Sequence, residues 1–202
     1  MTSTGQAPRS GPGAARPDLR YVVFIAAVAS MGGFLFGYDS AVVNGIVAAI
    51  RSGYAIGSAA LAQVIAVTLI GSAIGAVIAG RIADRIGRVR CMRIAAVLFT
   101  VGAINAALPF ALWEFVLWRI VTGFAIGVAL VVGPVYIAEI APPAYRGRLG
   151  SFQQAAIVVG YAISKLVNWG LLTAAGGDQR GHLMGLEVWQ VMLGVMVVPA
   201  VL

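Results

Sequence analysis

The sequence has little charge and few of the residues that soluble enzymes use for catalysis. Only 10% of its 202 residues are charged, and it contains a single cysteine, Cys91, and a single histidine. One cysteine excludes a disulfide within the chain and has no metal-ligand spacing, so we interpret it as a structural thiol. No constellation typical of a hydrolase, kinase or redox enzyme is present, and we predict neither enzymatic activity nor a bound metal or cofactor.

Apolar residues dominate the chain, at 60% of the total. A soluble domain of this size does not need so much apolar surface, whereas a membrane protein does. The 26 glycines agree with this interpretation, because small residues let membrane helices approach closely. The formal charge of +7 comes from arginines in short segments between apolar runs, so we attribute it to membrane topology and not to nucleic-acid binding.

Five apolar runs are each long enough to cross the hydrocarbon core of a bilayer, which takes about 20 helical residues. They lie at about residues 21–50, 59–79, 92–112, 113–137 and 150–173, and a sixth begins near residue 188 and is truncated at residue 202. Backbone in lipid must satisfy its own hydrogen bonds, so the predicted fold class is all-α, a polytopic membrane helical bundle over residues 21–202. Because the chain ends in apolar sequence, we interpret it as part of a longer protein.

The basic residues predict the orientation. Residues 1–20, rich in Gly, Pro, Ser, Ala and Arg, are expected to form a disordered tail. Arginines occur in this tail, between the second and third runs, and between the fourth and fifth, whereas the alternate connections hold only Arg51 and Arg180. The positive-inside rule then places the N-terminus and both arginine-rich loops in the cytoplasm, in a multi-pass protein of the cell membrane.

Two charged residues lie inside apolar runs, Asp39 in the first and Arg119 in the fourth. An ionised side chain at the bilayer centre costs roughly 2.5 to 3.5 kcal/mol on insertion scales, so such residues usually pair, line a cavity or function in transport. A static ion pair between two helices is the alternative, although apolar packing is the better source of net stability. At 1.5 Å per residue, Asp39 is about 17 Å deep and Arg119 about 9 Å deep, a gap that helix tilt and a long arginine can bridge.

A polar stripe is predicted on the fifth run. Gln154, Tyr161, Lys165 and Asn168 are separated by 7, 4 and 3 residues, so they share one narrow side of a helix. Such a stripe should face protein or water. Each sugar hydroxyl both donates and accepts hydrogen bonds, and the amide of Gln154 supplies both kinds of group.

Residues 80–90 (GRIADRIGRVR) join two predicted spans and resemble the signature loop between helices two and three of the major facilitator superfamily. Three further segments narrow the resemblance to the sugar porter family: residues 33–39 (GFLFGYD), residues 119–127 (an arginine followed by two glycines) and residues 134–148 (PVYIAE leading to RGR). The resemblance implies the N-terminal six-helix half of a twelve-helix transporter, whose C-terminal half is absent from this sequence.

The resemblance also implies a proton-coupling pair. An aspartate at the Asp39 position together with an arginine at the Arg119 position resembles proton-coupled sugar symporters. Burial favours a neutral carboxyl group and a neighbouring guanidinium favours an ionised one, so a movement that separates the two changes the proton affinity. Asp39 would carry the proton and Arg119 would tune its affinity.

Substrate-binding residues follow from the same resemblance. Gln154 matches the family's sugar-binding glutamine, Ile157 and Tyr161 fall at substrate-contacting positions, and Phe36 falls at an aromatic position of the first helix. Ordinary helix packing is an equal alternative for Phe36 and Ile157. Lys165 departs from the family, where this position is usually uncharged.

Three roles are open for Lys165. It could pair with Asp39, alter the proton coupling, or attract an acidic substrate.

Charged residues on the cytoplasmic side resemble the family's inner charge network, which closes the inner gate when the two halves meet. They are Arg81, Asp84, Arg85, Arg88, Glu139, Arg146 and Arg148, and Gly87 permits a backbone turn among them. Surface ion pairs are worth about 0 to 1 kcal/mol each, which suits a latch that opens in every cycle. The positive-inside rule alone explains the positions of Arg90 and Arg93, but this rule gives the acids Asp84 and Glu139 no role.

These observations predict proton-coupled symport of a sugar or polyol by alternating access. The expected partners are the solute, a proton, the lipid bilayer and the C-terminal half-domain. One alternative is a proton-coupled organic acid symporter, suggested by Lys165. Another is a non-transporting fragment or sensor of the same fold.

Overall fold

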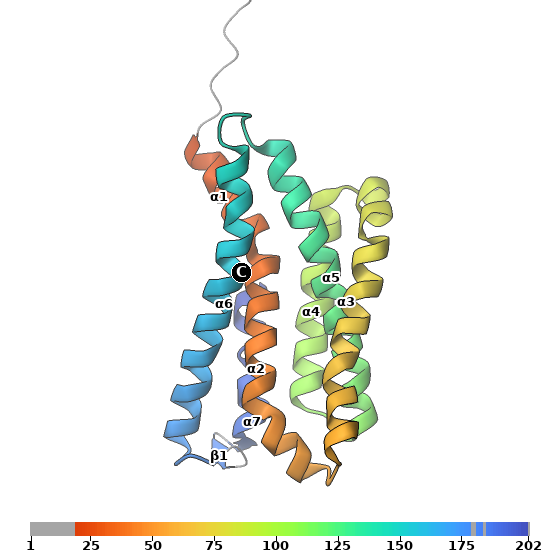
Figure 1. Ribbon diagram of the computed structural model, residues 1–202, viewed down its shortest axis with the longest axis vertical. Helices are drawn as coiled ribbons and strands as arrows, with labels where there is room; N and C mark the ends of the chain where they lie inside the picture. Colours follow the sequence, from red (N-terminus) through yellow and green to blue (C-terminus); the bar gives the residue numbers. More distant parts are fainter. Residues whose placement is uncertain (1–18, 179–180, 184, 202) are drawn as a thin grey trace, which may run out of the picture.

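The computed structural model describes residues 19–178, 181–183 and 185–201, which form a bundle of long helices (Figure 1). The long elements are α1 (Leu19–Ala29), α2 (Met31–Gly53), α3 (Ser58–Ile86), α4 (Arg88–Ala107), α5 (Leu112–Ile140) and α6 (Arg146–Ala174). A small hairpin of β1 (His182–Leu183) and β2 (Leu186–Glu187) follows, and then α7 (Val188–Gly194) and α8 (Val197–Val201). The tail expected over residues 1–20 lies outside the described residues, except for its last two, which belong to α1.

The described residues contain 5 helical segments that are long and apolar enough to cross a membrane, as the hydropathy predicted. The first, Arg20–Gly53, comprises both α1 and α2. It is interrupted at Ser30, whose Oγ donates to the carbonyl oxygen of Ala26 at 2.7 Å. A serine hydroxyl bonded to the carbonyl four residues earlier often bends a helix, so the predicted single run over residues 21–50 is two helical pieces.

Helix boundaries differ from the predicted runs where the chain leaves the apolar region. The second run was predicted to end at residue 79, but α3 continues to Ile86 and α4 begins at Arg88. The expected basic loop is therefore the single residue Gly87, with φ at 88°, a conformation that favours glycine. The third run was wrongly extended to residue 112, because α4 ends at Ala107 and Pro109 lies in the connection to α5.

The sixth run is also divided. Instead of one helix from residue 188, the chain forms α7 and α8, which together make a short apolar segment. The last of these elements, α8, packs against α4 and α2. The hairpin of β1 and β2 was not predicted from the sequence.

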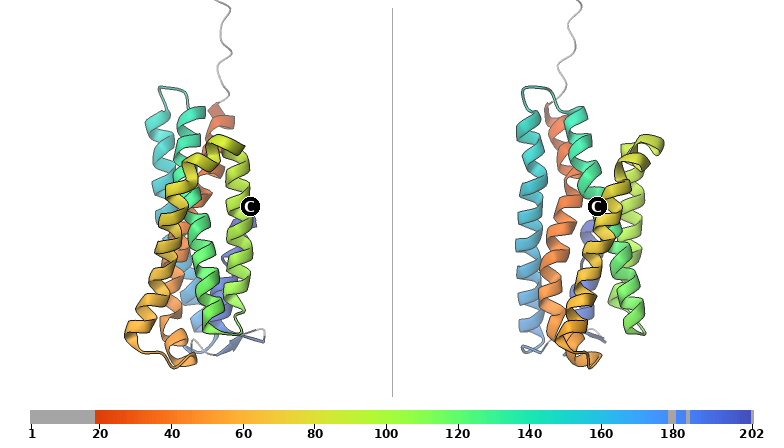
Figure 2. Two further views of the ribbon diagram at one scale, coloured as in Figure 1. Left: turned by 90° about the vertical axis from the view of Figure 1, so that its right-hand side faces the viewer. Right: turned by 45° about the vertical axis from the view of Figure 1, so that its right-hand side comes forward.

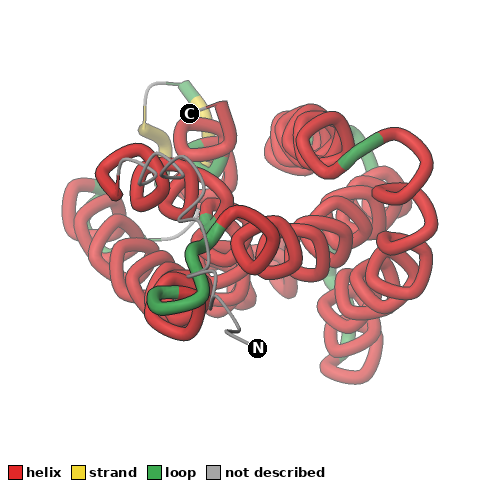
Figure 3. Tube along the Cα trace, turned by 90° about the horizontal axis from the view of Figure 1, so that it is seen from above, coloured by secondary structure: helices red, strands yellow, loops and turns green. Residues whose placement is uncertain are grey.

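The helices pack most extensively as α2 against α6, α3 against α5, and α4 against α5. The right-hand view of Figure 2 shows α6 and α2 side by side and α3, α4 and α5 as a second group, and Figure 3 shows the bundle along the direction of its helices. Glycines permit the closest contacts: Gly37 of α2 lies against the carbonyl group of Ile157, and Gly160 of α6 lies against that of Phe34. Small residues allow membrane helices to approach in this way.

Candidate transport site

A buried ion pair joins α2 to α5. Arg119 Nη1 donates to Asp39 Oδ1 at 2.5 Å, and Nη2 donates to Oδ2 at 3.0 Å. The two side chains are only 2% and 5% exposed. This is the bidentate arrangement that a planar guanidinium forms with a carboxylate. The structure therefore brings together the two charges that the sequence placed inside separate apolar runs.

Close packing of α5 on α3 holds Arg119 inside the bundle. Gly123 lies against the carbonyl group of Thr68, and Gly127 lies against that of Ser72. A side chain at either glycine would push the two helices apart. The hydroxyl of Thr122 donates to the carbonyl of Arg119 at 3.1 Å, within the same turn of α5.

The predicted stripe on α6 divides between two environments. Gln154, Tyr161 and Lys165 are exposed, whereas Asn168 is buried against α2, where its amide lies next to Gly45. The Lys165 ammonium is 5.5 Å from the centre of the Tyr161 ring, a distance typical of a cation–π contact. We call the exposed residues Gln154, Tyr161 and Lys165 the polar strip.

The polar strip separates two other faces of α6. The face buried against α2 and its neighbours contains Gly160 and Ser164. The face on the other side of the strip is exposed and apolar, with Val159, Ile163 and Leu166. Apolar exposure on a spanning helix suits lipid, whereas an exposed polar strip requires water, a solute or another protein surface.

Sequence reasoning missed a second row of polar groups on α2. Ser40 and Asn44 follow Phe36 at intervals of four residues, so the three share one edge of the helix. Asn44 is exposed, and Ser40 and Phe36 are half-buried. The spacing is visible in the sequence, but sequence reasoning singled out only Asp39 and Phe36 in this helix.

The α2 row and the polar strip lie on the same side of the α2–α6 pair. Gly37 contacts Ile157 and Gly45 contacts Asn168, so residue numbers rise together and the two helices are parallel. In two parallel helices, side chains that are turned away from the contact in opposite rotational directions point to the same side of the pair. Asn44 precedes the contact residue Gly45 by one residue, and Lys165 follows the buried Ser164 by one residue, so the two side chains are turned in opposite directions and point to the same side.

The other predicted contact residue, Ile157, is half-buried, and its backbone carbonyl packs against Gly37. Phe36 packs at the edge of the main apolar core. Both residues make helix-packing contacts and remain partly exposed. Lys165, which could have paired with Asp39, instead lies over Tyr161, and Asp39 binds Arg119.

Gln153 is a buried polar residue that the sequence did not identify. It is 7% exposed, and its side-chain amide lies near Gly33 of α2 and Gly133 of α5. Neither its Oε1 nor its Nε2 has a hydrogen-bond partner among the described residues. Its neighbour Gln154 is exposed, so adjacent glutamines have different environments.

The arginine-rich ends of α3, α4 and α5 are joined through Arg88. Its Nη1 lies 2.5 Å from Asp84 Oδ1, and its Nε lies 3.1 Å from Glu139 Oε1. The structure thus brings three members of the predicted charge network together. The remaining members are exposed there: Arg81, Arg85, Arg146 and Arg148.

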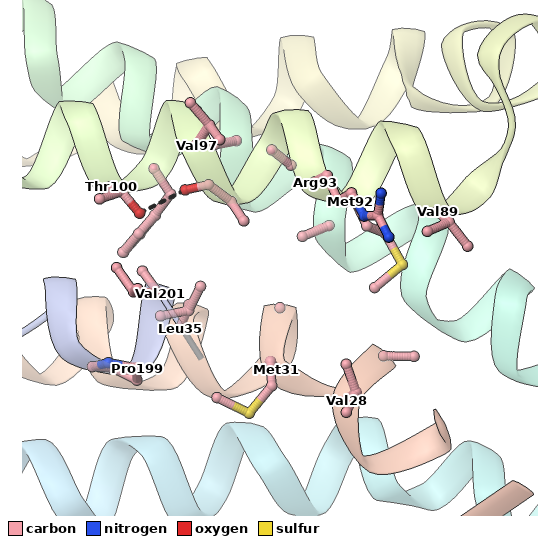
Figure 4. A pocket seen from close by; sticks show the side chains of 18 of the residues that line it. Val28, Met31, Leu35, Val89, Met92, Arg93, Val97, Thr100, Pro199 and Val201 are labelled. Atoms are coloured by element: carbon pink, nitrogen blue, oxygen red, sulfur yellow. Dashed lines mark hydrogen bonds between the residues drawn. The ribbon is translucent and has the colours of Figure 1, made fainter. Parts of the chain in front are cut away.

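An apolar groove of about 830 Å³ lies elsewhere in the molecule, with α2 and α4 along its sides and the end of α8 projecting into it (Figure 4). Val28, Leu35 and Val97 are typical of its lining. The Thr100 hydroxyl in the groove already donates to the Ala96 carbonyl at 2.8 Å. The groove includes neither the ion pair nor the polar strip, and its chemistry suits an apolar occupant.

A multi-span helical bundle with a buried ion pair and a separate exposed polar strip has the features of a membrane transporter. The chain belongs to the sugar transporter family of the major facilitator superfamily, because residues 25–202 match the family model described as "Sugar (and other) transporter". This is a family of transporters, not of enzymes.

Similar proteins agree with this assignment. The chain is 45% identical over 196 residues to the "Glucose transport protein" of Synechocystis sp., covering 96% of this chain and 42% of the relative. It is 33% identical over 208 residues to the "D-xylose-proton symporter" of Escherichia coli, covering 90% and 42%. The chain therefore spans less than half the length of these relatives.

Solved structures show the same fold. The proton:xylose symporter XylE bound to 6-bromo-6-deoxy-D-glucose superimposes with a TM-score of 0.82 at 33% identity, covering 91% of this chain and 43% of that one. The inward open conformation of XylE from E. coli gives a TM-score of 0.79, again at 33% identity. The helical bundle described above corresponds to the N-terminal half of that fold.

Proposed function

We propose that the full-length gene product carries a sugar or polyol across the cell membrane together with protons, by alternating access. The observation that carries this proposal is the buried, bidentate pair of Asp39 and Arg119. The glucose, xylose and arabinose carriers among the similar proteins support the solute class, and the xylose and arabinose carriers are proton symporters.

In the proposed cycle, Asp39 is the proton carrier. While it is ionised it binds the guanidinium of Arg119 and links α2 to α5. Protonation removes the negative charge and with it the strongest part of this link. The two helices can then move relative to each other, which couples proton binding to the change of access.

The solute site in this proposal is the polar strip, facing a second half of the carrier. The Gln154 amide can donate to and accept from sugar hydroxyls, and the Tyr161 hydroxyl can do the same. The N-terminus and the arginine-rich ends of α3, α4 and α6 would face the cytoplasm, where Arg88, Asp84 and Glu139 form part of the inner gate.

The test is the substitution Asp39→Asn in the full-length gene product, reconstituted into proteoliposomes. Asparagine is nearly isosteric but cannot carry the proton, so accumulation of sugar driven by a pH gradient should be lost. Exchange of labelled for unlabelled sugar at equal pH should persist, because exchange needs no net proton movement.

A control is needed because Asp39→Asn leaves Arg119 buried without a carboxylate, which can destabilise a protein by itself. The double variant Asp39→Asn with Arg119→Gln removes both charges and should also exchange sugar without accumulating it. Undiminished uphill uptake in either correctly folded variant would show that Asp39 does not carry the proton.

A further inference from the structure

We infer that Lys165 makes the outer part of the polar strip a carboxylate-binding subsite, so that the carrier accepts sugar acids such as hexuronates besides neutral sugars. This inference rests on the proposed function, since it assigns a substrate class to the same site. Lys165 is then a specificity-determining residue.

The first observation is an uncompensated cation on a spanning helix. The Lys165 side chain is exposed and contacts the face of the Tyr161 ring, and no carboxylate pairs with it among the described residues. Lys165 precedes the end of α6 at Ala174 by about 14 Å at 1.5 Å per residue, deeper than a lysine side chain extends. A charge held there is costly unless it faces water or an anion.

The second observation is that the other membrane-embedded charges compensate each other. Arg119 donates both of its terminal nitrogens to Asp39 and is only 2% exposed. Because the side chain is buried, its remaining N–H groups are not accessible to a solute. Lys165 remains as the cation of the exposed face, and it lies between the polar strip's tyrosine and the outer end of α6.

Polar groups of α2 lie at the same level as Lys165. Gly37 lies against Ile157 and the backbone nitrogen of Tyr161, and Gly45 lies against Asn168, so Lys165 lies opposite the segment between these glycines. Ser40 and Asn44 are within this segment, on the edge that faces the same side as the polar strip. Asn44 Nδ2 donates to the Ser40 carbonyl at 3.2 Å, which leaves its second N–H group for another acceptor. An ammonium and an amide N–H are donors that suit a carboxylate.

The inner part of the strip has a different chemistry. Gln154 and Phe36 supply an amide and an aromatic ring and carry no charge. An amide and an aromatic face suit a hydroxylated ring, whereas the outer part suits an anion. A hexuronate has a hydroxylated ring at one end and a carboxylate at the other, which matches this order of groups.

The test measures competition in proteoliposomes containing the full-length gene product. Unlabelled glucuronate, glucose and xylose are titrated against the exchange of labelled glucose, for the wild type and for Lys165→Gln. We expect glucuronate to compete with glucose in the wild type, and we expect its inhibition constant to rise by about tenfold to a hundredfold in Lys165→Gln, since a charge-assisted hydrogen bond is lost. Inhibition by unlabelled glucose should change by less than about threefold, because a neutral sugar makes no ion pair.

Two control variants make the result specific. Lys165→Arg retains the charge and should retain glucuronate competition. Arg90→Gln removes one exposed positive charge far from the strip and should leave all three inhibition constants unchanged. Glucose exchange without glucuronate competition, or equal competition in the wild type and Lys165→Gln, would overturn the inference and leave the proposed function intact. Absence of exchange for every solute would overturn both.

Discussion

At the scale of the residue, Gln153 and Gln154 show how one helical step separates two roles. A step of about 100° around α6 carries the side chain from the buried contact with α2 and α5 to the exposed polar strip. The same residue type is therefore placed once inside the protein and once where a solute can reach it. The pair offers a matched test of the site.

For Gln154→Ala we predict weaker binding of the transported sugar. The lost amide leaves a sugar hydroxyl unsatisfied in the closed site, at a cost of about 1 to 3 kcal/mol. Titration of sugar against the purified full-length gene product measures the dissociation constant. Because the side chain is exposed, the melting temperature should stay close to that of the wild type, and an unchanged dissociation constant would remove Gln154 from the site.

For Gln153→Leu we predict a melting temperature equal to or above that of the wild type. Leucine has a similar shape and removes two buried polar atoms that lack partners among the described residues. Each unsatisfied buried group costs about 1 to 3 kcal/mol. Thermal unfolding in detergent measures the change, and clear destabilisation would show that the Gln153 amide is satisfied in the native protein, for example by water.

Sequence reasoning located Asp39 and Arg119 because a charge inside an apolar run stands out by itself. It also found Gln154, Tyr161 and Lys165, since helical spacing groups them. Spacing alone did not show where the protected face of α6 ends, so Asn168 was grouped with residues that are exposed. To place Ser40 and Asn44 beside the polar strip, one must know the register between α2 and α6, and this register depends on tertiary packing.

At the scale of the element, the contact between α2 and α6 depends on glycine. A Cβ atom at position 37 would collide with the carbonyl group of Ile157, which belongs to backbone and cannot rotate away. We predict that Gly37→Ala destabilises the full-length gene product by about 1 to 3 kcal/mol, the usual range for overpacking. Thermal unfolding and sugar exchange should both report the change.

Gly170→Ala is the matched control for this prediction. Gly170 is also in a spanning helix, α6, but a Cβ atom there would meet no heavy atom within 4 Å. Its stability should be unchanged or slightly higher, because alanine is the better helix former. Equal stability of the Gly37 and Gly170 variants would contradict the importance of the α2–α6 approach.

Hydropathy predicted the existence of the spanning helices better than their ends. It reports where a chain leaves lipid, whereas a helix ends where its backbone hydrogen bonding ends. The charged turns of α3 therefore continue to Ile86, beyond the apolar run. In contrast, the connection between α4 and α5 is itself largely apolar, so only Pro109 indicated it. The break between α7 and α8 had no comparable signal.

At the scale of the whole molecule, the charged ends of the helices define two sides. The Arg88 cluster and the exposed Arg81, Arg85, Arg146 and Arg148 lie at the end of the bundle where α3 and α5 end and α6 begins, and the turns after α2 and α4 lie at the other end. Both ion pairs in the cluster are exposed, so water and salt screen them. We therefore predict that the cluster serves orientation and gating more than stability.

We predict that the arginine-rich end faces the cytoplasm. Ser58, the first residue of α3, and Ala144, in the turn before α6, are exposed at opposite ends of the bundle. Single cysteines at these positions report the two sides, and Cys91 is buried and should react little with a polar maleimide. In intact cells a membrane-impermeant maleimide should label Ser58→Cys, and Ala144→Cys should react only after permeabilisation. Cys91→Ser in the same background removes residual labelling, and the reverse pattern of reactivity would place the N-terminus and the proposed inner gate outside the cell.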